Sequence, residues 1–366
     1  MIHATPFNVF VILILSCVHA TLAAGSDAGK ANAISSGLRY LAESGEAWKE
    51  NRGCVSCHQI PPMLWAMNLA QKYSLSNALP SKSEDIPPEI NSTDEGTSDA
   101  STTDNEPPPV TQASMSIENW NAWSVDVVNF VKPHQKATCN IEETMTGNID
   151  TMAVLLLASP TTTAGDWKQR FAKHLVSQQA DDGSWNPCGQ LPAQRREVSE
   201  TRLATTLWVA LALEQERVDY ADEKVNQLLS EAKEASTTEI LALRLMLAKQ
   251  FTNIDVDDTI RQLSDFQNDD GGWGWKLDEP SDALGTGYAL FALRTIGPKM
   301  SDNPSQTLLQ LEPLIAKAEE YLINSQQFDG RWRVPGTKKS ANGKHTATAN
   351  DWGSAWAVIA LLSRAD

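Results

Sequence analysis

The chain has 366 residues, long enough for one large domain or two of ordinary size. Apolar residues make up 41% of it, charged residues 21%, and its formal net charge is −16. This composition excludes a polytopic membrane protein, a fully disordered chain and a small disulfide scaffold. The negative charge disfavours binding to nucleic acid or to anionic lipid, because their phosphate groups would be repelled.

The first 24 residues are predicted to be an export signal. Residues 7–18 form an almost unbroken apolar run, and small residues suited to signal cleavage follow from Thr21 to Gly25. The run is too short to span a bilayer, and no later segment could span one. A poor lipobox ending at Cys17 offers an alternative, a lipid anchor. We therefore expect an exported protein, either periplasmic or secreted.

The mature chain, residues 25–366, is predicted to be a single domain that an acidic insertion interrupts. Residues 75–117 are dominated by Ser, Thr, Pro, Asp and Glu, and eight acidic residues face one lysine, Lys82. Such a composition cannot bury enough apolar area to order itself. We expect this insertion to be disordered.

A motif of Gln-x-x-Asp-Gly-x-Trp occurs three times, at residues 179–185, 267–273 and 326–332. Each copy follows a helical segment with one polar face and precedes a helical segment that is apolar nearly all round. This asymmetry predicts an outer ring of helices packed on an inner ring. The leading and trailing helices are predicted, pair by pair, at Trp167–Gln179 and Glu200–Leu213, Asp257–Gln267 and Ser281–Leu293, and Leu311–Gln326 and Asp351–Leu362.

Three more helical pairs lack the motif and bring the total to six hairpins, which predicts an all-α fold. They are predicted at Ile34–Trp48 with Pro61–Lys72, Ile117–Val131 with Asn148–Ala158, and Ala221–Ala235 with Thr237–Lys249. Six hairpins with these turns resemble the terpenoid cyclase and protein prenyltransferase superfamily. The resemblance implies an (α/α)6 toroid whose inner helices surround a funnel.

The turn motif itself is expected to be structural. Its Gln, at the end of an outer helix, can hydrogen-bond backbone at the following turn. The Asp and Gly shape that turn, and the Trp stacks across the helix terminus.

Residues 255–259 spell the Asp-x-Asp-Asp-Thr acid motif of squalene-hopene cyclase-like enzymes, whose middle Asp protonates an alkene. That resemblance makes Asp257 and Asp258 candidate catalytic residues. However, the motif lies at the start of an outer helix, where N-capping is the simpler role. At the inner-helix position Asp282 and Thr286 match the family pattern, but Leu284 and Gly285 stand where acids belong. We therefore expect the proton donor to be absent.

A prenyltransferase-like zinc site is not supported either. Asp282 could supply one ligand, but no Cys and His partners occur on the neighbouring hairpin.

The sequence Cys54-Val55-Ser56-Cys57-His58 has the spelling of c-type haem attachment and resembles that of cytochromes c over these five residues. The resemblance implies thioether bonds from Cys54 and Cys57 to haem c, with His58 as an axial iron ligand. The alternatives are a structural Cys54–Cys57 disulfide, or metal or dithiol chemistry. Cys139 and Cys188 could form a second disulfide. No distal ligand can be chosen among Met63, Met67, His134 and His174.

Six aromatic residues fall on the predicted inner helices, and some should face the axis. They could line a funnel for an apolar ligand such as an isoprenoid, or they could be core packing. These residues are Trp65, Trp208, Tyr288, Phe291, Trp352 and Trp356. Four acids at predicted inner-helix starts could form an acidic mouth or act as N-caps, namely Asp150, Glu200, Asp282 and Asp351.

Three functions therefore remain open. The first is a haem module that transfers electrons to a periplasmic redox partner. The second is an enzyme that acts on an isoprenoid, and the third is a noncatalytic scaffold that binds a protein or glycan.

Overall fold

The computed structural model describes seven stretches of the chain, residues 27–48, 59–73, 149–159, 166–187, 193–231, 234–296 and 304–363. These stretches are helical and contain no strand, which confirms the all-α prediction. The predicted signal, acidic insertion and Ile117–Val131 helix lie outside the described residues. So do the Cys54–His58 motif, Cys139 and Cys188.

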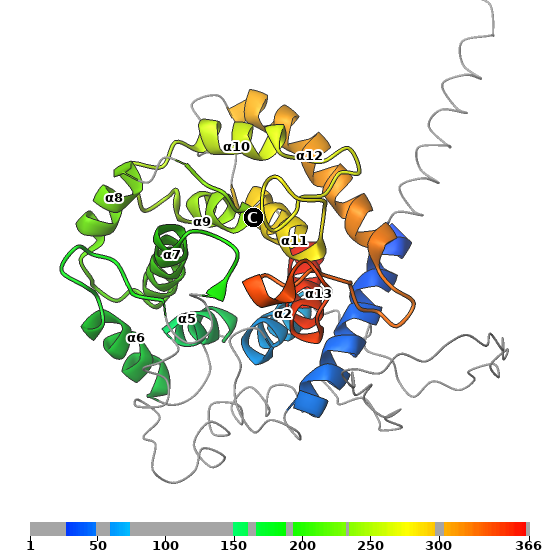
Figure 1. The fold of residues 1–366 in the computed structure, drawn as a ribbon, viewed down its shortest axis with the longest axis horizontal. Coiled ribbons are helices and arrows are strands. Elements are labelled where there is room, and N and C mark those ends of the chain that lie inside the picture. Colours follow the sequence, from blue (N-terminus) through cyan, green and yellow to red (C-terminus); the bar gives the residue numbers. More distant parts are fainter. Residues whose placement is uncertain are drawn as a thin grey trace, which may run out of the picture.

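Six helices contact one another in a closed cycle, in the order α2, α5, α7, α9, α11, α13 and back to α2 (Figure 1). They are α2 (Ile60–Lys72), α5 (Ile149–Ala158), α7 (Val198–Glu216), α9 (Thr238–Leu247), α11 (Ala283–Thr295) and α13 (Ala347–Leu362). Five described helices lie outside this inner ring. They are the helix at residues 27–48, α6 (Trp167–Ser177), α8 (Asp222–Glu231), α10 (Val256–Asp265) and α12 (Pro304–Ser325).

The two layers differ in burial as their sequences predict. Every residue of α5 is buried, and in α13 the side chains are buried from Ala349 to Leu362. In the outer helix α10 only Thr259, Ile260 and Leu263 are buried, on one stripe. An inner helix needs apolar residues all round because it is covered on every side, whereas an outer helix needs one apolar face.

The three motif turns have one common geometry. In each turn the Gln side-chain amide donates to the carbonyl of the motif Gly, at 2.8 to 2.9 Å. Each Trp indole N–H donates to the carbonyl ten residues earlier, on the outer helix, at 2.6 to 2.8 Å. The motif glycines all have a φ of 88°, in the left-handed region. The expected structural role of the motif is confirmed.

Each motif Gln also bonds the next outer element, which sequence alone did not predict. The Nε2 of Gln179 donates to the carbonyl of Ala221, just before α8. The Nε2 of Gln267 donates to the carbonyl of Leu314 in α12. The last copy joins the two ends of the described chain, because Gln326 donates to the carbonyl of Ala33 in the first helix at 2.9 Å.

Three helix starts were predicted several residues too late. The first helix is already present at residue 27, seven residues before the predicted start at Ile34. α13 begins at Ala347 rather than Asp351, because the Thr346 side chain caps it by accepting from the N–H of Ala349. α12 begins at Pro304 rather than Leu311, and proline is favoured in a first helical turn. None of the described helices combines the length and apolar character needed to cross a membrane.

Candidate functional site at the mouth of the inner ring

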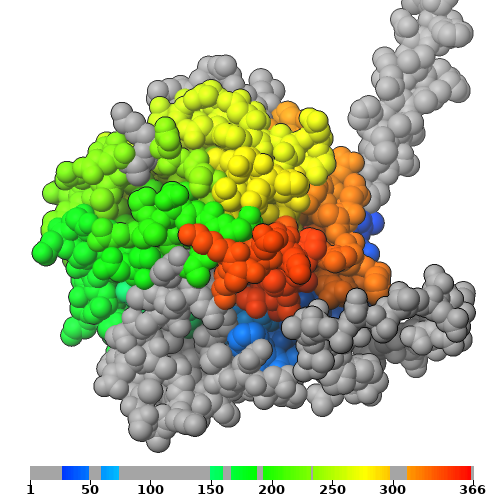
Figure 2. All heavy atoms as spheres, in the orientation of Figure 1, coloured from blue at the N-terminus to red at the C-terminus, as the bar shows by residue number. Residues whose placement is uncertain are grey.

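The connections that lead into the inner helices meet at one end of the ring, which we call the mouth. The N–H of Arg195, before α7, donates to the carbonyl of Thr337, before α13, at 2.8 Å. The Arg195 guanidinium pairs with Glu279, before α11. Figure 2 shows green, yellow and orange-red segments meeting over the centre of the ring, so the connections cover it on this face.

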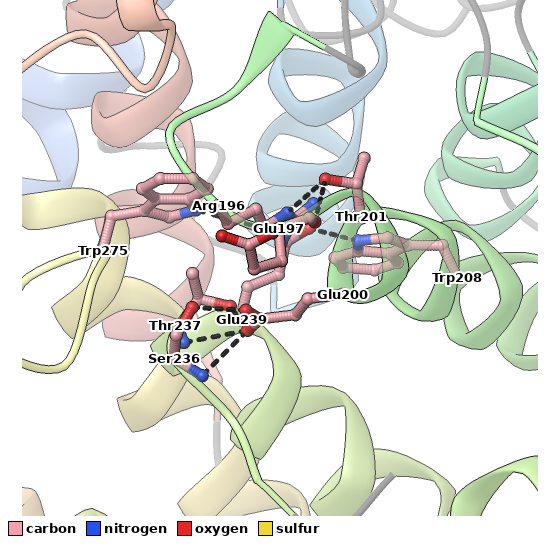
Figure 3. Close-up of polar contacts among 9 residues, drawn as sticks. All are labelled: Arg196, Glu197, Glu200, Thr201, Trp208, Ser236, Thr237, Glu239 and Trp275. Carbon is pink, nitrogen blue, oxygen red and sulfur yellow. Dashed lines mark hydrogen bonds and ion pairs between the residues drawn. The ribbon is translucent and has the colours of Figure 1, made fainter.

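A buried ion pair lies below these connections (Figure 3). The Arg196 Nη1 atom lies 2.7 Å from Glu239 Oε2, and their side chains are only 2% and 4% exposed. Glu239 also accepts from the indole N–H groups of Trp208, at 2.7 Å, and Trp275, at 3.3 Å. Because each carboxylate oxygen has a donor, this pair is a satisfied structural group that holds the segment before α7 in the ring.

Arg196 is further fixed by its neighbours. Its Nε atom donates to Thr201 Oγ1 at 3.3 Å, and its guanidinium lies 5.4 Å from the centre of the Trp275 ring. Sequence reasoning missed both Arg196 and Glu239. Sequence position could have pointed to Glu239, because it stands in the first turn of an inner helix, as Glu200 does.

Asp150, at the start of α5, is buried beside this pair. Its Oδ2 atom has no hydrogen-bond partner, and burial raises the pKa of this carboxyl to about 7. It is therefore the least satisfied of the four acids predicted at inner-helix starts.

Of the other three acids, only Asp282 is an N-cap as predicted; Glu200 and Asp351 lie inside α7 and α13 and bond neighbouring elements instead. Glu200 accepts from the backbone N–H groups of Ser236 and Thr237, each at 3.0 Å, just before α9 (Figure 3). Asp351 accepts from Tyr40 Oη at 2.6 Å and from Ser44 Oγ at 2.7 Å, both on the first helix.

Asp282 caps α11 with both oxygens engaged. Its Oδ1 atom accepts from the backbone N–H groups of Leu284 and Gly285, and its Oδ2 atom accepts from the backbone N–H of Trp275, each at 2.8 Å. Burial raises the pKa of Asp282 to about 6, and the three N–H donors oppose the rise. Thr286, which also matches the cyclase pattern, accepts from the N–H of Trp273 at 2.9 Å. Asp282 and Thr286 therefore both stabilise the turn that precedes α11.

The three aspartates of the Asp-x-Asp-Asp-Thr sequence lie on the outer layer, and none of them is buried. The Asp255 side chain caps α10 by accepting from the N–H of Asp258 at 2.9 Å, as predicted. Asp257 is exposed. The Arg261 guanidinium and the Gln262 amide hold the pKa of Asp258 below its usual value. This environment favours a carboxylate, the opposite of what a proton donor to an alkene needs.

The six predicted funnel aromatics form one connected cluster. The Trp356 ring lies 4.4 Å from Tyr288, 5.3 Å from Trp65, 5.6 Å from Trp208 and 5.7 Å from Phe291, between ring centres. α7, which carries Trp208, and α13 stand opposite each other in the inner ring. Their contact fills the axis at this level, so these aromatics are core.

The haem-type motif itself falls between the described residues Trp48 and Gln59. Gln59 is 2% exposed; its Nε2 donates to Ser44 Oγ at 2.8 Å, but its Oε1 atom has no partner. Of the residues discussed as distal ligands, Met63 and Met67 are both buried in the core. Among the described residues no group of three His, Cys, Asp or Glu side chains could hold a metal ion.

Comparisons with known proteins add no relative to this description. No protein-family model matches the chain, and no curated protein matches it.

Proposed function

We propose that this protein is an exported α/α toroid that carries a covalent c-type haem on Cys54 and Cys57, with His58 as axial ligand, and serves as an electron-transfer or haem-binding module. The observation that carries the proposal is the Cys-x-x-Cys-His sequence, located in the connection between an outer helix and the start of α2. When bound, the haem supplies reversible one-electron exchange.

The surroundings of the motif fit such a group. Two thiols and an adjacent imidazole are the donors that haem c requires. Gln59, which directly follows His58, has a buried side-chain oxygen without a partner, and such atoms call for a neighbouring donor. The Gln59–Ser44 bond joins the two helices that flank the motif, and Ser44 also donates to Asp351 on α13, which would limit the movement of a bound haem.

The filled axis argues against the isoprenoid-converting alternative. A cyclase needs a lumen and a neutral, desolvated acid, whereas aromatic rings meet across this ring and Asp282 accepts three backbone N–H bonds. The same observation favours a second candidate, a noncatalytic scaffold with a structural Cys54–Cys57 disulfide.

We further propose the complete (α/α)6 toroid. The closed cycle of inner helices and the Gln326–Ala33 bond support it. A sixth outer helix, predicted at residues 117–131, would complete the six hairpins.

The test is expression of the full chain in a bacterium that has the haem c maturation machinery. The purified protein should come from the periplasm without residues 1–24 and keep a Soret band after acid-acetone extraction. Cys54→Ser with Cys57→Ser should lose the pigment, and the matched control Cys139→Ser with Cys188→Ser should keep it.

Two outcomes would decide against this proposal. A colourless protein whose Cys54 and Cys57 resist alkylation until reduced would establish the disulfide scaffold. Conversion of squalene or a prenyl diphosphate by the wild type, lost in Asp257→Asn or Asp282→Asn, would establish the enzyme.

A further inference from the structure

A cavity of about 310 Å³ opens at the mouth of the ring, between the segment before α7 and the loop before α13. It borders the aromatic core at Trp352, which lines it. Its volume is at the lower end of the range found for small-molecule sites. A ligand of monosaccharide size would fill it.

The loop beside this cavity is basic in an acidic protein. From residue 330 to residue 350 there is no Asp or Glu, whereas the whole chain has a net charge of −16. The basic residues of this stretch are Arg331, Arg333, Lys338, Lys339 and Lys344. Lys338 lines the cavity, and so do Thr346 and Thr348 at the start of α13. A lysine and a helix N-terminus both favour a negative group.

A separate observation concerns Gln194, which comes from the segment before α7 and lines the cavity beside Lys338. Its side chain is 2% exposed, and its Oε1 atom has no hydrogen-bond partner. A buried amide oxygen without a donor is costly unless a ligand or a water supplies one. This atom has almost no accessible surface, so a ligand hydroxyl would satisfy it once the Gln194 amide turns toward the cavity.

The other residues that line the cavity also suit a ligand with hydroxyl groups. Thr337, Ser340 and Thr348 bring hydroxyls that can donate or accept, and Trp352 brings an aromatic surface. Hydroxyls, an amide and an indole suit a ring that carries several hydroxyl groups.

The loop is held in shape before any ligand arrives. The N–H of Gly336 donates to the carbonyl of Lys344 at 2.9 Å, and the N–H of Lys344 donates to Ala341 at 2.9 Å. Gln194 and Lys338 form an antiparallel bridge across the cavity rim. Preorganisation of this kind lowers the entropic cost of binding.

We propose that this cavity binds a small anionic sugar, a hexose that carries a carboxylate or a phosphate group. The anionic group lies by Lys338 and the start of α13, and the hydroxyls face Gln194 and the threonine side chains. The site is independent of the proposed haem, since its lining residues come from other connections.

The test is calorimetric titration of the full wild-type chain with glucuronate, glucose 6-phosphate, glucose and inorganic phosphate. At least one of the two anionic sugars should bind about tenfold more tightly than both glucose and inorganic phosphate, because a charge-assisted bond and the hydroxyl contacts each add to affinity. The preferred one identifies the anionic group. Equal binding of inorganic phosphate would overturn the sugar half of the proposal, and equal binding of glucose the anionic half.

The matched variants are Lys338→Gln and Lys339→Gln, which remove one charge each from adjacent positions. Only Lys338 lines the cavity, and Lys339 is exposed. Lys338→Gln should weaken binding about tenfold or more, and Lys339→Gln less than about threefold. Equal losses of affinity in the two variants would mean that the overall positive charge of the loop attracts the anion, which would overturn the proposal of a specific site.

Gln194→Leu provides an independent check, because it removes the unsatisfied oxygen and nearly keeps the side-chain volume. Affinity for the preferred sugar should fall while the thermal unfolding midpoint changes little. No heat of binding by any of the four compounds at millimolar concentration would overturn the proposal outright.

Discussion

The three motif turns at the edge of the ring and the aromatic cluster on its axis both hold helices together, but in different ways. At the edge of the ring, the same Gln, Gly and Trp hydrogen bonds tie each outer helix to the turn that follows it. On the axis no pattern repeats, and Trp356 fills the centre through contacts with rings from three other inner helices. Repeated local bonds fix each turn to its own outer helix, and unique side chains decide whether the inner ring is hollow.

The largest effect is expected from Trp356→Ala, which removes the ring at the centre of the cluster. If the axis is filled, the free energy of unfolding should fall by about 5 kcal/mol in urea titrations, because a large cavity is left. The variant should also bind indole and rise in melting temperature with it. A loss of about 1 kcal/mol without indole binding would indicate a hollow axis.

Next in size is Glu239→Gln, which leaves the Arg196 guanidinium buried without its carboxylate. The expected loss is about 3 kcal/mol, because one partner of a buried pair is removed while a hydrogen-bond acceptor remains. Glu231→Gln, at an exposed position of α8, is the control and should change the free energy of unfolding by less than about 0.5 kcal/mol. Equal effects would show that the ion pair is not buried.

The motif turns are tested by Gly330→Ala, at the turn that packs against the first helix. A Cβ atom there would collide with the backbone oxygen of Ser36 in the first helix, in addition to the left-handed strain. We expect a loss of about 2 kcal/mol or more. Gly343→Ala is the matched control, because Gly343 also has a positive φ, of 75°, but has no neighbour within 4 Å. Similar losses would argue that the first helix does not pack against this turn.

Asp150→Asn tests the electrostatics of the mouth through pH. The folded pKa of Asp150 is about 7, against about 3.9 for an unfolded chain. The folded state therefore keeps a proton that the unfolded state releases. This contribution is fully present below about pH 4, and is lost as the pH rises towards 7, with a slope of at most about 1.4 kcal/mol per pH unit.

The variant should therefore show a flatter stability curve than the wild type between pH 4 and pH 7, measured by urea unfolding. Parallel curves would mean that Asp150 ionises normally and is not buried.

The smallest effect is expected from Asp255→Ala, which removes the cap of α10. The loss should be about 1 kcal/mol, whereas Asp257→Ala, in the same acidic sequence, should cost less than about 0.5 kcal/mol. The reverse order would reopen a specific role for Asp257.

Much of the helical layout was predictable because the period and the polar face of a helix are written in consecutive residues. The inner helices α7, α9 and α11 begin within two residues of their predicted positions. The Asp255 cap was predictable because its bond to Asp258 spans a single turn. The starts of α12 and α13 were missed because the signals, Pro304 and Thr346, lie in segments of mixed composition.

The sequence by itself determined the all-helical class, the two kinds of helix and the motif turns, because those bonds join residues within about ten positions of one another. Tertiary structure alone decided that the aromatics fill the axis, that Arg196 meets Glu239, and that Gln194 and Lys338 border one cavity. These partners come from different hairpins, and the closing of the ring sets which of them meet.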